Sequence, residues 1–342
     1  MLEFRRDIIL DEWVIISDER AKRPKIFKEE KIKVEPKITA VCPFDNGNEF
    51  MTPPEIMRMD QSGKIVGTNS EWQIRVVPNK FPVLKPDAAL STKRIGIYDV
   101  MGGFGIHEVI INSPDHLVNL SQLNEFNIKI IIETYVRRIK VIKKDSRIES
   151  VVIMLNQGKE AGASLEHTHS QIFAIPFISP VLERELHGTR RYYKNHKCCA
   201  MCDILDFEIG ENKRKIFENN DFLIIEPFAS RNPFETWIVP KKHHSNFETI
   251  NDEETSSFAE CLKILVDFFH YELNNSQFNY YIHTGPLHID SNYHYHWHFE
   301  LIPKLQIKAG FEIATGIDIC IATPEYTAEF MKNSALKRKF FK

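Results

Sequence analysis

The sequence predicts an α+β protein in which one unit, an antiparallel sheet with packed helices, occurs twice along the chain. Two observations predict this class. Short apolar strands and one long amphipathic helix follow one another in the same order in both halves. Polar landmarks also recur at one spacing, since Asn156 precedes His169 by as many positions as His283 precedes His296. A duplicated unit is the simplest account of both.

The first half supplies the elements of one unit in order. Strands are predicted over residues 71–84 and 106–114, a helix follows, and strands over residues 150–156 and 167–176 complete the unit. Ser121 is a suitable N-cap for the helix. The apolar residues of the helix recur at helical spacing: Ile128, Ile131, Tyr135, Ile139 and Ile142.

The second half repeats this order. Residues 220–244 contain two predicted strands, residues 251–273 form a helix with acidic residues in its first turn, and two further strands end near residue 303. One face of the helix is apolar through Phe258, Leu262, Leu265 and Phe269. We expect one domain over residues 1–185 and a second over residues 186–342.

The composition is that of a globular protein. The chain has 342 residues, of which 43% are hydrophobic and 27% are charged, with a formal net charge of -3. This balance provides no basic field for nucleic acid, and no apolar run is long enough to span a bilayer. The N-terminal residues lack a signal-peptide core, and the six cysteines do not form the pattern of a disulfide scaffold. We therefore expect a cytoplasmic protein with a small ligand, and neither nucleic acid nor membrane as partner.

The segment "HTHSQ" places two histidines and a glutamine at alternate positions. In a strand, alternate side chains share a face, so His167, His169 and Gln171 point one way. Thr168 and Ser170 then face the interior. Paired imidazoles fill a core poorly, because each ring nitrogen needs a hydrogen-bond partner. The pattern therefore indicates a face that acts on a ligand or a metal.

Four segments, in this order, resemble those of a known family: "DEWVIISDERAKRP" (11–24), "VVPNKFP" (76–82), "NQGKEAGASLEHTHSQI" (156–172) and "GFEIATG" (310–316). They make the chain similar to the histidine-triad superfamily and, within it, to the galactose-1-phosphate uridylyltransferases. The resemblance covers nearly the whole chain. It implies a tandem of two histidine-triad-like domains, of which the first carries the nucleophile and the second is degenerate and metal-binding.

The resemblance implies a nucleotidylyltransferase of galactose metabolism that exchanges UMP between UDP-glucose and galactose 1-phosphate by a ping-pong route. His169 would form the uridylyl-histidine intermediate, and Gln171 would hydrogen-bond a phosphoryl oxygen as charge builds there. Members of the family are usually dimers whose subunits complete each other's sites, which implies a homodimer. The residues that match substrate-side positions of the family are Arg20, Arg23, Asn79, Asn156, Ser164, Phe311 and Glu312.

The resemblance also implies one or two zinc ions per chain. The ligands of the first would be Cys42, Asp45, His107 and His167, with Asp45 where the family pattern has a second cysteine. The ligands of the second would be Cys199, Cys202, His243 and His296. A bacterial type of the family uses a glutamate and three histidines, which here would be Glu185, His283, His296 and His298. Two thiolates and two imidazoles make a closed tetrahedral set, which suits a structural zinc. We favour the cysteine version, because a Cys-x-x-Cys pair has little reason to occur without a metal in a reducing compartment.

Three alternatives stay open at this point. "HYHWHFE" could carry the nucleophile at His296. The cysteine pair together with "HTHSQ" also resembles plant ADP-glucose phosphorylase, which transfers an adenylyl group from ADP-glucose to phosphate. A non-catalytic protein that binds zinc or nucleotide is the third. Separate histidine substitutions and a search for nucleotidyl-enzyme would distinguish them.

Overall fold

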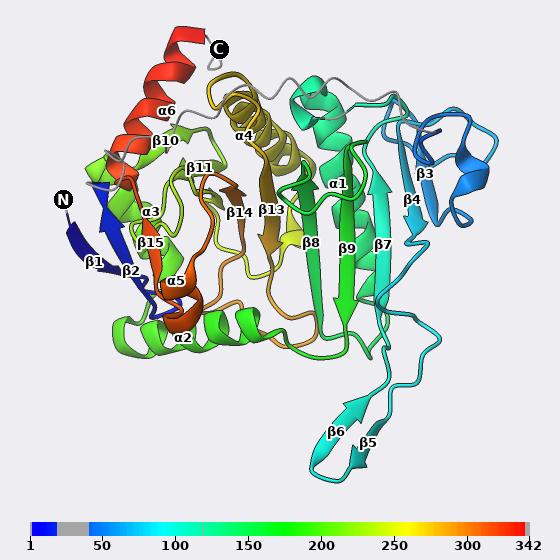
Figure 1. The fold of residues 1–342 in the computed structure, drawn as a ribbon, viewed down its shortest axis with the longest axis horizontal. Coiled ribbons are helices and arrows are strands. Elements are labelled where there is room, and N and C mark those ends of the chain that lie inside the picture. Colours follow the sequence, from blue (N-terminus) through cyan, green and yellow to red (C-terminus); the bar gives the residue numbers. More distant parts are fainter. Residues whose placement is uncertain (1, 19–40, 118, 339–342) are drawn as a thin grey trace.

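A ten-stranded antiparallel sheet runs through the molecule (Figure 1). The computed structural model describes residues 2–18, 41–117 and 119–338. From one edge to the other the sheet contains β10 (Lys215–Glu218), β11 (Phe222–Ile225), β12 (Thr236–Pro240), β14 (His298–Pro303), β13 (Phe278–His283), β8 (Ser150–Gln157), β9 (His169–Ile175), β7 (Ile106–Ile111), β4 (Ile74–Pro78) and β3 (Met57–Met59).

The strand order confirms the predicted repeat. In the first half the spatial order is β3-β4-β7-β9-β8, and in the second it is β10-β11-β12-β14-β13, so the last two strands exchange places in both. Each half is an antiparallel sheet with packed helices, as predicted. The halves meet where β8 pairs with β13, and the backbone hydrogen bonds of this pair join them into one sheet.

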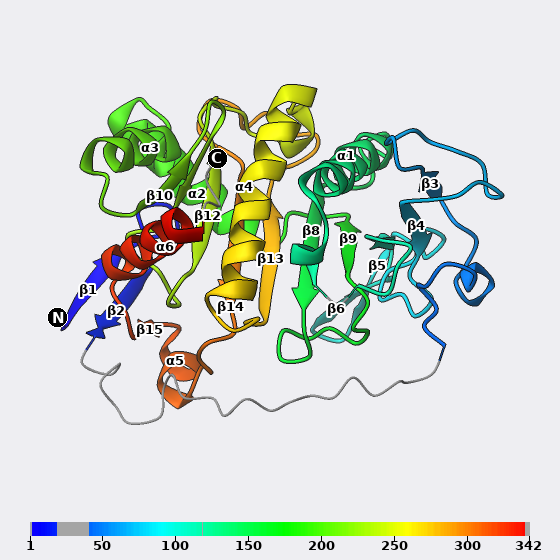
Figure 2. The same ribbon diagram turned by 90° about the horizontal axis from the view of Figure 1, so that it is seen from above.

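One long helix packs on the same face of each half. α1 (Glu125–Ile142) lies between β7 and β8 in the sequence, α4 (Asp252–Tyr271) lies between β12 and β13, and the two helices pack against each other (Figure 2). Their predicted apolar residues are buried. The predicted N-cap of the first helix is wrong, because Ser121 lies in a 3-10 turn (Leu120–Gln122) and Asn124 caps α1.

Residues near the start of the chain pack on the second half. β1 (Leu2–Arg6) and β2 (Trp13–Ser17) form a three-stranded sheet with β15 (Asp318–Cys320), which precedes α6 (Pro324–Arg338). An ion pair between Arg5 and Glu325 on α6 reinforces this contact. β15 and α6 therefore lie beside β1 and β2 in the structure.

The predicted domain boundary falls inside a helix. α2 (Pro180–His196) follows β9 and crosses one end of the large sheet (Figure 1), so residues 185 and 186 are neighbours within it. The division at this point stays a prediction. The short helices α3 (Ala200–Glu211) and α5 (Gly310–Thr315) belong to the second half of the chain.

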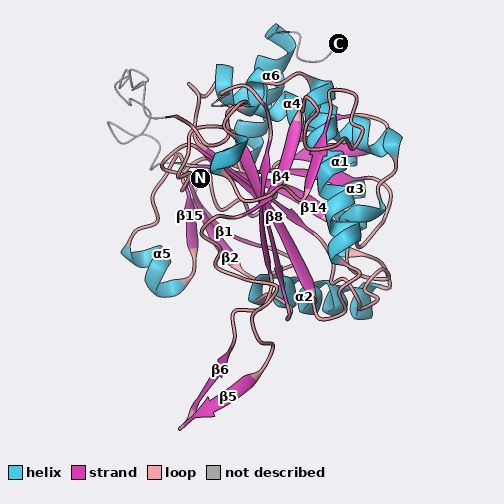
Figure 3. Ribbon diagram, turned by 90° about the vertical axis from the view of Figure 1, so that its right-hand side faces the viewer, coloured by secondary structure: helices cyan, strands magenta, loops and turns pink. Residues whose placement is uncertain are grey.

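A two-stranded hairpin of β5 (Thr92–Ile95) and β6 (Tyr98–Met101) projects from the body of the molecule (Figure 3). Two further 3-10 turns occur at Glu49–Met51 and Phe247–Thr249. Among the helices of the described ranges, none combines the length and the apolarity that crossing a membrane requires.

Candidate functional site

β9 places His169 and Gln171 on the sheet face opposite α1. Ser170 lies between them on the helix-covered face, where its hydroxyl contacts the hydroxyl of Tyr135 on α1. Thr168 is buried as well. The prediction that Thr168 and Ser170 face the interior is therefore confirmed.

The His169 imidazole has a defined tautomer. Its Nδ1 lies 2.8 Å from the carbonyl oxygen of His167, and because a carbonyl only accepts, Nδ1 carries the proton. The lone pair is then on Nε2. His169 is 8% exposed, the ring of Phe44 stands edge-on at 5.3 Å, and burial lowers the pKa of the imidazole. The ring is therefore neutral near pH 7 and offers a nucleophilic nitrogen.

His107 lies beside Gln171 and not beside the metal-ligand candidates. Its Nε2 is 2.8 Å from Gln171 Oε1. In the sheet, His107 pairs with Phe173 near one end of β7, whereas Ile111 pairs with His169 near the other end. Four residues of strand separate these ends by about 13 Å. The prediction that His107 belongs to the first metal site is corrected by this register.

A different histidine joins the first set of candidate ligands. The four side chains that gather there are Cys42, Asp45, His116 and His167, which we call the Cys–Asp group. His167 Nδ1 is 3.8 Å from Cys42 Sγ and 3.0 Å from Asp45 Oδ1, and His116 Nδ1 is 2.8 Å from the same oxygen. His167 Nε2 donates to the carbonyl of Ser113 at 2.9 Å, so the Nδ1 lone pair points into the group. These residue types and this orientation fit zinc.

The repeat itself held a signal for His116. His243 follows the end of β12, and His116 follows the end of β7, the strand that takes the same place in the first half. If the two halves are aligned strand by strand, the metal-ligand candidate His243 of the second half corresponds to His116 of the first half. Matching by motif alone led to His107, which lies within β7.

The structure brings together all four residues predicted for the second metal site: Cys199, Cys202, His243 and His296, the Cys–Cys group. Cys202 Sγ is 3.3 Å from His243 Nδ1 and 3.6 Å from His296 Nδ1. In a tetrahedral zinc site with bonds of about 2.0–2.3 Å, the ligand atoms stand about 3.3–3.8 Å apart, so this spacing fits. The hydrogen bond with Cys202, and then that with His243, lowers the pKa of Cys199. The group therefore favours a thiolate, which is the form that binds metal.

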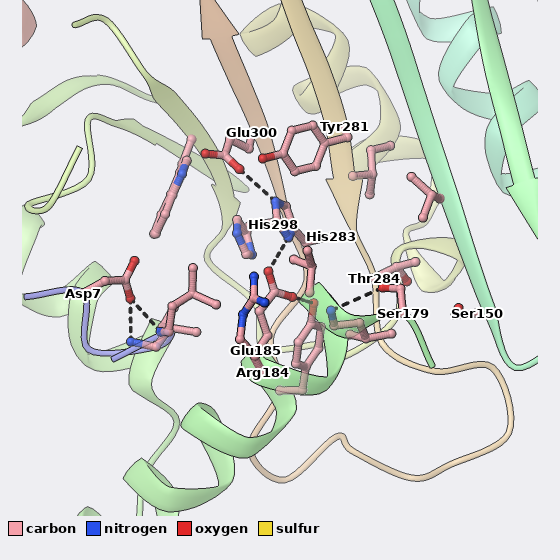
Figure 4. Close-up of a pocket in the computed structure, with 18 of the residues that line it drawn as sticks. Asp7, Ser150, Ser179, Arg184, Glu185, Tyr281, His283, Thr284, His298 and Glu300 are labelled. Atoms are coloured by element: carbon pink, nitrogen blue, oxygen red, sulfur yellow. Dashed lines mark hydrogen bonds and ion pairs between the residues drawn. The ribbon is translucent and has the colours of Figure 1, made fainter. Parts of the chain in front are cut away.

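A third cluster lines a cavity of about 360 Å³ between α2 and the sheet (Figure 4). It contains Glu185, His283 and His298, the Glu–His–His group. Glu185 Oε1 is 2.6 Å from His283 Nδ1, and Glu300 Oε2 is 3.0 Å from His283 Nε2. Burial opposes the charge on His283, but Glu185 and Glu300 raise its pKa to about 10. A protonated imidazole thus bridges two carboxylates.

His296 does not join the Glu–His–His group. The alternative set with three histidines therefore does not assemble, because His296 faces Cys202 while the His298 ring stacks on His283 with the centroids 4.2 Å apart. The physical reason is that β14 begins at His298, so His296 lies before the strand and does not follow its alternation.

The loop between β8 and β9 is anchored by the second half. Asn279 Nδ2, on β13, donates to Asn156 Oδ1 and to the carbonyl of Ala161, both at 2.7 Å. Gly158 has a φ of +89°, and a Cβ at this position would lie 2.5 Å from the side chain of Gln277. Only glycine avoids both penalties. The second half thus fixes the loop that leads to His169.

The other predicted substrate residues lie in three places. Asn79 is near the site, with its Nδ2 3.0 Å from His107 Nε2, and Ser164 is exposed in the loop before β9. Phe311 and Glu312 are on α5, which lies apart from β9 in Figures 1 and 2.

Glu312 has a local role at the start of α5, because its carboxylate accepts from the backbone N–H of Ala309. Arg20 and Arg23 lie outside the described residues. The part of the site that the described residues assemble is therefore the start of β9 with His169, the loop before it and the Cys–Asp group.

The duplicated α+β unit, with a histidine and a glutamine at the start of one central strand, defines a protein of the histidine-triad type. The family model "Galactose-1-phosphate uridyl transferase, N-terminal domain" matches residues 2–179, and the corresponding C-terminal domain matches residues 185–333. The chain therefore belongs to the galactose-1-phosphate uridyl transferase family, whose members transfer nucleotidyl groups.

Two relatives show how the chain compares within this family. ADP-glucose phosphorylase of Arabidopsis thaliana is 34% identical over 341 residues, covering 98% of this chain and 93% of the relative. Galactose-1-phosphate uridylyltransferase of Thermotoga maritima is 29% identical over 347 residues, covering 98% of this chain and 100% of the relative.

Solved structures agree with this placement. The crystal structure of the Arabidopsis thaliana ADP-glucose phosphorylase with bound ADP-glucose matches with a TM-score of 0.82 and 32% identity, covering 97% of this chain and 99% of that one. A uridylyltransferase structure matches with a TM-score of 0.77 and 27% identity, covering 99% of both chains.

Proposed function

We propose that the protein transfers a nucleotidyl group from a nucleoside diphosphate sugar through a covalent intermediate on His169. The observation that carries this proposal is the hydrogen bond from His169 Nδ1 to the carbonyl of His167, which leaves the Nε2 lone pair as the nucleophile. Gln171, two residues further along the same strand face, supplies a hydrogen bond to a phosphoryl oxygen.

The reaction proceeds in two displacements. Nε2 of His169 attacks the α-phosphorus, a P–N bond forms, and the bond from phosphorus to the bridging oxygen breaks to release sugar 1-phosphate. A second phosphate-bearing acceptor then attacks the same phosphorus, and the imidazole leaves with its lone pair restored. One site can serve both displacements, because donor and acceptor present similar phosphate groups.

The first substrate pair to test is UDP-glucose with galactose 1-phosphate, as the family resemblance implies. ADP-glucose with inorganic phosphate is the second candidate. Two observations favour it: the Cys–Cys group, a feature of the plant type, and the 34% identity with ADP-glucose phosphorylase. Both substrate pairs require the same nucleophile and the same two displacements.

Zinc is proposed for the Cys–Asp group and for the Cys–Cys group. Bound there, zinc would be a structural ion that ties distant segments together. In the Cys–Asp group the ion would hold His167, whose carbonyl orients the His169 ring. Thiolate ligands also suit the reducing cytoplasm that the sequence predicts.

A homodimer is part of the proposal. Phe311 and Glu312 match sugar-side positions of the family, yet α5 lies apart from β9 in the same chain (Figures 1 and 2). A second copy could bring its own α5 to the site. We expect sedimentation to give a dimer and a mixture of His169→Asn and Phe311→Ala chains to regain part of the activity. A monomer, or no recovery on mixing, would contradict this part.

Intact-mass spectrometry tests the proposed function. The protein is incubated briefly with UDP-glucose and, separately, with ADP-glucose, and His169→Asn is treated in the same way. We expect a uridylyl or adenylyl adduct on the wild type and none on the variant. The base of the adduct identifies the substrate class. Absence of both adducts would support a non-catalytic binding protein instead.

A further inference from the structure

His107 occupies a buried place beside the nucleophile strand, outside both zinc-ligand groups. The side chain is 7% exposed, and its ring stacks on Phe173 of β9 with the centroids 4.1 Å apart and the planes 24° apart. Stacking and the strand pairing of His107 with Phe173 fix the plane of the ring. The two ring nitrogens therefore point at defined neighbours.

The neighbours of the His107 ring define its tautomer. The backbone N–H of Val83 points at Nδ1 with an N–N distance of 3.3 Å. A backbone N–H only donates, so Nδ1 accepts and the proton is on Nε2. That Nε2–H donates to Gln171 Oε1 at 2.8 Å. Burial lowers the pKa of His107, which is consistent with the neutral form.

This hydrogen bond decides which end of the Gln171 amide is a donor. A glutamine amide carries an acceptor oxygen and a donor NH2 group that exchange places when the amide turns over. With Oε1 held by His107, the NH2 group is the end left for a ligand. In the reverse orientation, the oxygen would face the phosphoryl oxygens and repel the charge that builds on them.

We propose that His107 is a positioning residue that holds the Gln171 amide with its NH2 group as the donor to the phosphoryl group transferred to His169. This inference rests on the proposed function. His107 then acts on Gln171, whereas the family resemblance had implied that it is a metal ligand.

Asn79 competes for the same ring nitrogen. Its Nδ2 lies 3.0 Å from His107 Nε2, and its Oδ1 accepts from the N–H of Phe81 at 2.8 Å. If Asn79 donated to Nε2, the His107 proton would be on Nδ1. It would then face the backbone N–H of Val83, which can only donate. The half-buried amide of Asn79 can instead donate to solvent or to a ligand, so the arrangement with Gln171 leaves fewer donors unpaired.

A double-mutant cycle tests the proposal. The rate of nucleotidyl-enzyme formation is measured by rapid quench and intact mass at saturating UDP-glucose or ADP-glucose, whichever labels the wild type. His107→Phe keeps the stacked ring and removes the donor, and we expect a loss of about 10- to 100-fold, comparable to that of Gln171→Ala. The double variant should be no slower than Gln171→Ala, because both changes remove one interaction.

Two matched controls separate positioning from structure. His107→Gln places an amide nitrogen near the position of Nε2 and should restore most of the rate, whereas His107→Asn places it near Nδ1 and should not. Bound zinc should stay at the wild-type level in His107→Phe and fall in His116→Ala. If His107→Phe does not fold, the comparison of the glutamine and asparagine variants decides.

The outcomes that overturn the proposal are distinct from failure of the proposed function. Additive losses in the double variant, or an unchanged rate in folded His107→Phe, would remove the positioning role while the chemistry at His169 stands. Loss of zinc from His107→Phe would return the residue to the metal ligands. A wild type that forms no adduct with either nucleotide-sugar overturns the proposed function, and this inference with it.

Discussion

β9 and β14 occupy the same place in the two halves of the sheet, yet their surroundings differ. Each strand begins with a histidine, His169 in β9 and His298 in β14. The third residues are Gln171 and Glu300. The strand framework therefore presents a histidine and a second polar residue at equivalent positions in both halves.

The metal-ligand groups repeat with the strands. His167 precedes β9 and belongs to the Cys–Asp group, whereas His296 precedes β14 and belongs to the Cys–Cys group. His296 thus corresponds to His167, and the counterpart of His169 is His298. The equal spacings from Asn156 to His169 and from His283 to His296 therefore do not join equivalent residues, and the repeat rests on the strand order. The alternative that places the nucleophile at His296 loses its support from this correspondence.

The difference lies in what covers the two strands. In the second half, α2 and the segment around Asp7 close a cavity over the Glu–His–His group (Figure 4). His298 is 4% exposed, and burial, followed by the nearby His283, lowers its pKa to about 3. Buried Glu300 forms an ion pair with half-buried Arg231. A carboxylate at this position would repel a phosphoryl group. Under the proposed function, the first half therefore carries the chemistry and the second half uses the same framework for stability.

Two histidine substitutions give the largest expected contrast. His169→Asn removes the nucleophile, so the rate of nucleotidyl-enzyme formation should fall by a factor on the order of 10⁴ or more. His298→Asn alters a buried neighbour of His283 and should leave that rate within about threefold, since it touches no reacting group. Time-resolved intact mass measures both. Loss of the adduct in a folded His298→Asn protein would show that the division of roles is wrong.

Exchanging the residues at the third strand position sharpens the comparison. Gln171→Glu places a negative charge beside the phosphoryl group and should slow adduct formation by about 10²–10³-fold, with little change in melting temperature. Glu300→Gln should instead lower the stability of the protein and leave the rate of adduct formation unchanged.

The reason is that Glu300→Gln removes the buried carboxylate that pairs with half-buried His283 and half-buried Arg231. The free energy of unfolding should fall by about 3 kcal/mol, with the adduct rate preserved. Urea unfolding and adduct kinetics on both variants check the pair of expectations. Equal effects of the two substitutions on stability would contradict it.

Removal of the second metal site should destabilise the protein. Cys202→Ser takes one thiolate from the Cys–Cys group, and the loss in unfolding free energy should reach roughly 4 kcal/mol when zinc is present at about 1,000 times its dissociation constant. Cys198→Ser is the matched control, because Cys198 lies next to the group and its thiol bonds Asp203 instead. Thermal unfolding with and without a chelator measures the effect, and equal behaviour of the two variants would argue against a bound metal.

Adding a thiolate to the Cys–Asp group should strengthen zinc binding, whereas removing one from the Cys–Cys group weakens it. Asp45→Cys supplies a second thiolate and should slow the loss of zinc to a chelator, since thiolates are the stronger zinc ligands. The release of zinc can be followed with a chromogenic chelator. Faster release from Asp45→Cys than from the wild type would mean that the carboxylate geometry is the better one.

The smallest expected effect tests the support that the second half gives to the first. Asn279→Ala removes two hydrogen bonds that hold Asn156 and the loop at Ala161, so the KM for the nucleotide-sugar should rise by about two- to tenfold. Asn195→Ala, at an exposed position of α2, is the control. Steady-state kinetics give both values, and an unchanged KM would show that the loop holds its shape without Asn279.

The sequence by itself determined the features that depend on neighbouring residues. The order of the central strands and of the two long helices, the buried faces of α1 and α4, the alternation around His169 and the grouping of Cys199 with Cys202 could be predicted, because strand and helix periods and short spacings are local properties.

Only the tertiary structure decided which distant side chains meet. His107 and His116 both precede α1 in the sequence. The register of β7 against β9 places His107 beside Gln171, whereas the turn after β7 places His116 beside His167. In the same way, the start of β14 separates His296 from His298. Strand ends, register and the segments that cover a sheet depend on long-range pairing, and a spacing along the chain does not encode them.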